Sequence, residues 1–65
     1  MIISKEFEWY GDNYLVEAEV NMHYTDIELD YYTIFDREGR DITYTIFPSM
    51  EEEIMDWLEN YEYGE

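Results

Sequence analysis

The strongest constraint on the fold is an alternation of apolar and polar residues between Tyr14 and Tyr24. The apolar members are Val16, Ala18, Val20, Met22 and Tyr24, and the polar members are Glu17, Glu19, Asn21 and His23. Because successive side chains of a β-strand point to opposite faces, a period of two is typical of a half-buried strand. We therefore expect a strand with one face on a core and an acidic face in water.

A second alternating segment, residues 2–10, precedes this strand and is joined to it by the turn formers Gly11, Asp12 and Asn13. The central pair of the turn is either Gly11-Asp12 or Asp12-Asn13. Both registers place Phe7 and Trp9 on the side of Val16 and Ala18. Both also set Glu against Glu: Glu6 opposite Glu17 in the first, and Glu8 opposite Glu17 with Glu6 opposite Glu19 in the second. Opposed like charges destabilise a sheet, so this arrangement suggests a purpose other than stability.

A second hairpin is predicted from residues 27–36 and 40–47, with a type I turn over 36–39 that places Gly39 in the left-handed region. If Asp36 faces Arg40, one side of this hairpin carries Tyr32, Ile34, Ile42, Tyr44 and Ile46, and the other carries Leu29, Tyr31, Phe35 and Phe47. We expect the first set in the core. Part of the second set would then be exposed as a patch for a partner or for a second copy of the chain.

The last element is predicted to be a helix. Pro48 would end the preceding strand, Ser49 is a good N-cap, and Glu52 completes a capping box. Apolar residues then recur at helical spacing at Met50, Ile54, Trp57, Leu58 and Tyr61. The expected fold is a single α+β domain over residues 1–65, a four-stranded antiparallel meander with one C-terminal helix packed on one face (β-β-β-β-α).

Charge is the dominant feature of the composition, with 18 acidic residues, three basic residues and a net charge of −15. Such a charge is typical of disorder, but 46% of the residues are hydrophobic and 20% are aromatic, enough to build a core. Self-repulsion destabilises a compact chain, so the acidic surface is expected to have a use. The lack of cysteine, signal peptide and membrane span predicts a cytoplasmic protein, in the host cell if the chain is phage-encoded.

No enzymatic chemistry, metal site or cofactor is predicted. The single histidine, His23, lies on the polar side of its strand, and no nucleophile and base pair can be built around it. Acidic residues alternate from Asp26 to Asp30, but the EF-hand pattern needs glycine at its sixth position, where this chain has Tyr31. A domain of one sheet and one helix also lacks the cleft that glycosidase chemistry requires.

Three explanations of the charge compete: mimicry of nucleic acid, general solvation such as halophilic adaptation, and an acidic module for another basic partner. Alternate residues of a strand are about 6.6–6.8 Å apart, within a factor of two of the 3.4 Å axial spacing of charge along one DNA strand. Halophilic adaptation does not account for the aromatic content or for Glu opposite Glu. The sign of the charge argues against direct binding of nucleic acid. We therefore expect phosphate mimicry.

The acidic candidates for contact with a basic partner are Glu6, Glu8, Glu17, Glu19, Glu28, Asp30, Asp36, Glu38, Glu51, Glu52, Asp56 and Glu59. The aromatic candidates are Tyr10, Tyr31 and Tyr61, because tyrosine is enriched at interfaces and can face Arg and Lys.

In size, acidity and lack of cysteine, the whole chain resembles the small phage-encoded DNA-mimic inhibitors, among them many anti-CRISPR proteins. That resemblance implies a partner that binds nucleic acid through a basic channel, with a CRISPR effector complex favoured. Restriction enzymes, repair enzymes and nucleoid proteins are other targets of this type. The alternative is a binding or regulatory module, or a homodimer, that uses the aromatic side of strands three and four.

Overall fold

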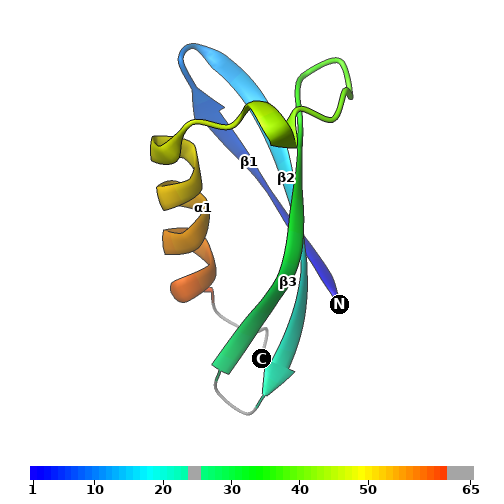
Figure 1. Ribbon diagram of the computed structural model, residues 1–65, viewed down its shortest axis with the longest axis vertical. Coiled ribbons are helices and arrows are strands. Elements are labelled where there is room, and N and C mark those ends of the chain that lie inside the picture. Colours follow the sequence, from blue (N-terminus) through cyan, green and yellow to red (C-terminus); the bar gives the residue numbers. More distant parts are fainter. Residues whose placement is uncertain (24–25, 62–65) are drawn as a thin grey trace.

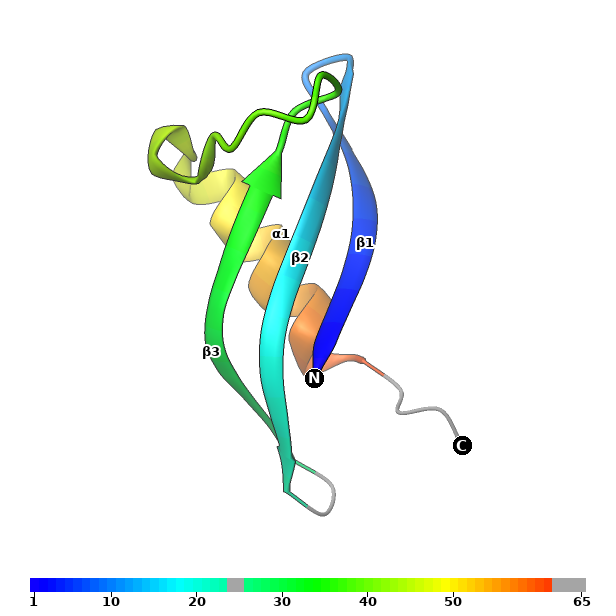
Figure 2. The same cartoon turned by 90° about the vertical axis from the view of Figure 1, so that its right-hand side faces the viewer.

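The computed structural model describes residues 1–23 and 26–61 and contains one antiparallel sheet and one long helix. The sheet has three strands in the order β1 (Ile2–Trp9), β2 (Asp12–His23) and β3 (Asp26–Phe35). A 3-10 turn, η1 (Thr43–Thr45), leads to α1 (Pro48–Glu59). α1 packs across one face of the sheet and leaves the other face uncovered (Figures 1 and 2).

The core lies between α1 and the sheet and is built from the positions that the alternation and the helical stripe indicate. Its buried members are Ile3, Phe7, Trp9, Val16, Ala18, Val20, Ile34, Met50, Ile54 and Leu58. Trp57 and Tyr61 are partly buried against this cluster. The ring of Phe7 stacks on Trp9 and meets Trp57 edge to face, at centroid distances of 4.8 and 5.7 Å. The predicted strand 14–24 and the predicted helix face are thus confirmed over the described residues.

The first hairpin turns earlier than predicted. Trp9 pairs with Asp12, so Tyr10 and Gly11 are the central residues, with φ of 54° and 82°. Two positive φ values are typical of a type I′ turn, and the predicted pairs Gly11-Asp12 and Asp12-Asn13 are both wrong. The ring of Tyr10 lies edge to face on Phe47 at 5.9 Å, and its Oη is 3.1 Å from Ser49 Oγ. These contacts to the start of α1 help to hold tyrosine in a conformation that it rarely adopts.

The observed register also removes the predicted opposition of glutamates. Glu17 lies opposite Ser4, and Glu19 lies opposite Ile2. Glu6 faces Leu15, and Glu8 faces Asn13. The register differs from the predicted ones by an even number of residues, so the faces of the strands are unchanged while the repulsive pairs are avoided.

A β-bulge in β3 changes which of its residues face the core. The pairing of Glu19 with Tyr31 is followed by that of Val20 with Leu29, which leaves Asp30 as the additional residue. Leu29 and Tyr32 both pack against the core, so the expectation that Leu29 shares a side with Tyr31 is wrong. One inserted residue reverses the alternation beyond it.

The predicted fourth strand, residues 40–47, does not form, and the sheet has three strands. Only an isolated bridge between Phe35 and Asp41 continues the sheet. Side chains then replace the strand ladder: Thr43 Oγ1 accepts the Ile34 N–H at 2.9 Å, and Asp41 Oδ1 accepts the Thr43 N–H at 3.0 Å. Local bonds of this kind compete with strand pairing. Tyr44, predicted in the core, is 86% exposed as a result.

The helix begins earlier than predicted. Phe47 is the N-cap and Pro48 occupies the first helical position, so Pro48 starts the helix instead of ending a strand. The Phe47 carbonyl accepts the N–H groups of Met50 and Glu51 at 2.9 and 3.2 Å. The predicted capping box of Ser49 and Glu52 is therefore wrong, and Ser49 lies against Tyr10 instead. Within the described residues, no helix is long and apolar enough to cross a membrane.

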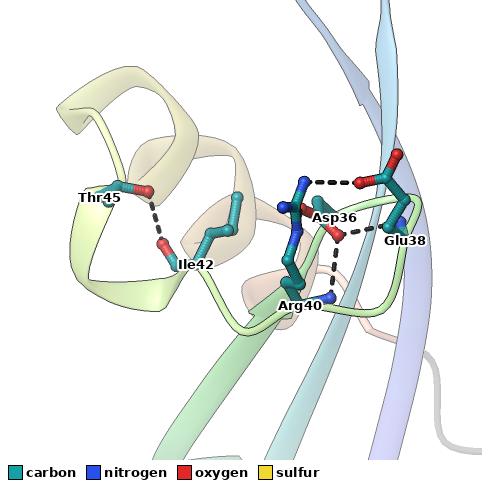
Figure 3. Close-up of polar contacts among 5 residues, drawn as sticks. All are labelled: Asp36, Glu38, Arg40, Ile42 and Thr45. Carbon is teal, nitrogen blue, oxygen red and sulfur yellow. Dashed lines mark hydrogen bonds and ion pairs between the residues drawn. The ribbon is translucent and has the colours of Figure 1, made fainter.

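The turn after β3 forms as predicted and is organised by the carboxylate of Asp36 (Figure 3). Asp36 Oδ1 accepts the N–H groups of Glu38 and Arg40, each at 2.9 Å, and Gly39 has φ of 84°. The Arg40 guanidinium reaches Asp36 Oδ2 at 3.0 Å and Glu38 Oε1 at 2.6 Å. The pKa of the Asp36 carboxyl is lowered below its usual 3.8, mainly because the carboxylate accepts a hydrogen bond from the backbone N–H of Arg40.

This lowered pKa predicts a pH-dependent effect of Asp36→Ala. A carboxyl whose pKa is lower in the folded state stabilises the fold above its unfolded pKa, and this contribution is lost as the pH falls through the folded pKa. Asp36→Ala should therefore be less stable than the parent at pH 7, and the difference should narrow below pH 3.8. Urea denaturation across this range, with Glu38→Ala as the control for the Arg40 contact, measures it. A difference that is constant with pH would contradict the assignment.

Candidate protein-binding surface

The uncovered face of the sheet, called here the outer face, gathers six of the predicted acidic residues. From the β1–β2 turn downward, the paired rows are Glu8 with Asn13; Glu6 with Leu15 and Phe35; Ser4 with Glu17 and Thr33; and Ile2 with Glu19 and Tyr31. Beyond the bulge, Asn21 pairs with Glu28, and its Nδ2 donates to Asp30 Oδ2 at 3.1 Å. Figure 2 views the sheet from this side, with α1 behind it.

These acids form a line that crosses the sheet from β1 through β2 to β3. We call it the acidic diagonal, and it consists of Glu8, Glu6, Glu17, Glu19, Asp30 and Glu28. Each of the four rows above the bulge contributes one carboxylate. Neighbours on one strand are about 6.6–6.8 Å apart, and the step between strands from Glu6 to Glu17 is a cross-strand diagonal of about 7–8 Å. The spacing from Glu8 through Glu6 and Glu17 to Glu19 is therefore nearly even.

Most of the diagonal lacks a compensating cation. Glu6, Glu8 and Glu17 make no ion pair or hydrogen bond to any described residue. Glu19 lies 2.8 Å from the amino group of Met1, and Glu28 lies 3.2 Å from His23 Nε2. Within the described residues, much of this negative charge is therefore not neutralised by a neighbouring cation.

Lys5 and Arg40 lie away from the diagonal, whereas Arg37 lines the same surface groove as Glu6 and Glu17. Lys5 lies on the helix side, where its Nζ is 5.2 Å from the centroid of the Phe7 ring. Arg37 and Arg40 both belong to the turn after β3, which lies at the same end of the sheet as the β1–β2 turn (Figures 1 and 2). Arg37 Nη1 is 3.7 Å from Asp12 Oδ1, and Arg40 is paired with Asp36 and Glu38.

Apolar side chains lie beside the acids on the outer face. Leu15 is 39% exposed and Tyr31 is 60% exposed, and Phe35 is half-buried. The alternation already places Leu15 on the side of Glu17 and Glu19, but Leu15 was not among the predicted contact residues. Phe35 belongs to the set that was expected to leave an exposed patch for a partner. The outer face therefore offers a partner both charge and apolar area.

An open groove of about 510 Å³ lies where the outer face meets the turn after β3. Leu15 and Phe35 are adjacent in one cross-strand row and contribute apolar lining, and Glu6 and Glu17 contribute carboxylates. Arg37 and Gly39 line it from the turn. This groove combines an apolar lining with carboxylates that have no described partner.

The remaining predicted acids lie elsewhere. Glu51, Glu52, Asp56 and Glu59 are exposed on α1, which covers the opposite side of the sheet, and Asp36 and Glu38 are engaged with Arg40. Tyr32 Oη donates to Glu51 Oε2 at 3.4 Å. The pKa of Tyr32 is raised, mainly because the side chain is partly buried. The structure thus brings half of the predicted acids together on the outer face. Of the other half, Asp36 lines the groove beside Glu6 and Glu17 but is paired with Arg40, and the rest lie apart from the diagonal.

The predicted tyrosines also divide. Only Tyr31 lies on the outer face, where it pairs with Glu19. Tyr10 is exposed at the β1–β2 turn and contacts the start of α1, and Tyr61 packs against the core and meets Trp57 at 6.4 Å. His23 is exposed at the far end of β2. Among the described residues, no group of three or more His, Asp or Glu side chains is arranged to hold a metal ion.

No protein-family model, curated protein or solved structure matches this chain.

Proposed function

We propose that the chain is a nucleic-acid mimic that inhibits a DNA-binding protein by placing its outer face in that protein's basic groove. The observation that carries the proposal is the acidic diagonal, six carboxylates on a sheet face that no other described element covers. From Glu8 to Glu19 the steps of about 6.6–8 Å correspond to roughly every second phosphate along one strand of DNA. A groove lined with Arg and Lys would meet carboxylates where it normally meets phosphates.

The position of the charge favours mimicry over general solvation. Solvation requires only that acids be exposed, whereas Glu6, Glu8 and Glu17 on this face form no ion pair within the described part of the chain. Leu15, Phe35 and Tyr31 beside them supply contact area that a halophilic surface does not need. The predicted Glu-Glu pairs do not form, so they no longer support mimicry over general solvation. The acidic diagonal is the observation that now supports it.

The resemblance to small phage-encoded mimics makes the DNA-binding channel of a CRISPR effector the first target to test. The same face also suits the basic grooves of restriction, repair and nucleoid proteins. In the alternative of a regulatory binding module, the contact would shift to Tyr31 and Phe35. Phe47, the expected contribution of a fourth strand, instead caps α1.

Affinity capture from a bacterial lysate tests the proposal. The immobilised protein should retain a nucleic-acid-binding protein at about 50 mM salt and release it at about 1 M, where the Debye length shrinks to about 3 Å. An immobilised oligoglutamate peptide is the control, because it carries charge without the ordered diagonal. Capture of a partner that does not bind nucleic acid, or equal capture by the peptide, would contradict mimicry.

A further inference from the structure

We propose that the groove beside Leu15 and Phe35 is a receptor for a single arginine side chain of the partner protein. This inference rests on the proposed function and specifies one contact within it. The methylene stem of the arginine would pack on the apolar lining, and its guanidinium would pair with Glu6 and Glu17.

The arrangement of the lining suits an amphipathic cation. Leu15 is the centre of the row Glu6, Leu15, Phe35, and Glu17 follows Leu15 by two residues on the same strand and the same face. A methylene stem lying on Leu15 and Phe35 would therefore have a carboxylate on each of two sides. Long basic side chains commonly bury their stems on apolar surface in this way.

The groove favours arginine over lysine. A guanidinium is planar, carries five donors and stacks on aromatic faces, whereas an ammonium is a compact point charge. Glu6 and Glu17 are cross-strand diagonal neighbours about 7–8 Å apart at Cβ, so a planar donor between them can reach both. Phe35 adds an aromatic surface on the adjacent strand.

Two features indicate that no described residue occupies the groove. Glu17 is half-buried, yet neither it nor Glu6 is paired with any described residue. Arg37 also lines the groove, but its guanidinium lies near Asp12, at 3.7 Å. The volume of about 510 Å³ lies within the range of sites that hold small ligands.

An NMR titration of the free, ¹⁵N-labelled protein with N-acetyl-arginine methylamide tests this assignment. Saturable shifts are expected at the amides of Leu15, Glu17 and Phe35, with a dissociation constant on the order of millimolar for so small a ligand. The citrulline analogue, which has the same shape without the charge, should produce no saturable shift. The lysine analogue should bind more weakly.

Substitutions separate the groove from general charge attraction. Glu17→Gln should weaken arginine binding about two- to fivefold, as expected for an exposed ion pair, and Leu15→Ser should weaken it without changing the charge. Arg37→Gln should strengthen binding, because it removes a neighbouring cation. Glu52→Gln on α1 is the control and should leave the constant unchanged, and the spectra of all variants report whether they are folded.

Three results would overturn the receptor assignment: shifts spread equally over α1 and the sheet, equal affinity for arginine and lysine, or no effect of Leu15→Ser. Because the titration uses no partner protein, its failure would leave mimicry by the acidic diagonal in place. Failure of the capture experiment with a successful titration would instead retain an arginine site and reject the nucleic-acid-binding target.

Discussion

Replacing Glu6 and Glu17 together by lysine is expected to weaken binding to the captured partner by at least about a hundredfold. Both residues belong to the acidic diagonal, and neither is paired with any residue that the structure describes. Reversal places like charges against a basic groove, and such contacts cost several kcal/mol, with about 1.4 kcal/mol for each tenfold in affinity. Isothermal titration calorimetry with the purified partner measures the change. The folded state should be as stable as the parent or more so, because self-repulsion falls.

The matched control is Glu52→Lys with Glu59→Lys on α1. It changes the net charge by the same amount but on the opposite side of the sheet (Figure 1). We expect at most a severalfold loss of affinity from the weaker long-range field. Equal losses in the two double variants would show that total charge, and not the outer face, determines binding.

The second large effect is expected from Ile54→Ala in the core. Ile54 has no exposed surface and lies on the face of α1 that covers the sheet. Truncation of a buried isoleucine typically costs about 2–5 kcal/mol, whereas 65 residues at roughly 0.05–0.15 kcal/mol each provide only about 3–10 kcal/mol of stability. Much of the variant should therefore be unfolded or close to unfolding at 37 °C. Urea denaturation followed by tryptophan fluorescence measures the loss.

Met55→Ala, one residue further along the helix, is the control, because Met55 is exposed. Because Met55 is 37% exposed but also lines a groove with Leu29 and Leu58, its loss of unfolding free energy should be clearly smaller than that of Ile54→Ala. Similar costs for Ile54→Ala and Met55→Ala would mean that α1 does not pack on the sheet through the face described here.

The sequence predicts the faces of this fold better than its connections. Burial follows periodicity, so Val16, Ala18 and Ile54 could be assigned to the core from spacing alone. The β1–β2 turn depends instead on Tyr10 adopting a positive φ, supported by contacts with Phe47 and Ser49 from the distant helix. Turn propensity favours the Gly-Asp-Asn run and contains no information about such tertiary contacts.

The fourth strand was mispredicted for a similar reason. Residues 40–47 alternate like a strand, but the Asp41 side chain bonds the backbone of Thr43, the Thr43 side chain bonds the backbone of Ile34, and the pairing ends after one bridge. The bulge at Asp30 likewise cannot be predicted from the alternation of apolar and polar residues. Strand propensity does not predict whether a backbone group will bond a side chain or a neighbouring strand, because either hydrogen bond satisfies it.

The candidate site was predicted in composition but not in arrangement. The acidic residues of the three strands could be assigned to the solvent side from alternation. Their order into one diagonal depends on the register, which the turn at Tyr10 and Gly11 sets. Phe35 joins Leu15 on the outer face only because β3 pairs with β2 in the observed register.

The most direct measurement of the central claim is the affinity of the purified partner for this protein between 50 and 200 mM salt, with and without duplex DNA. Mimicry by the acidic diagonal predicts that affinity falls by at least about tenfold over this range. It also predicts that DNA and this protein exclude each other from the partner. An affinity that does not change with salt, or a ternary complex in which the partner holds both, would contradict it.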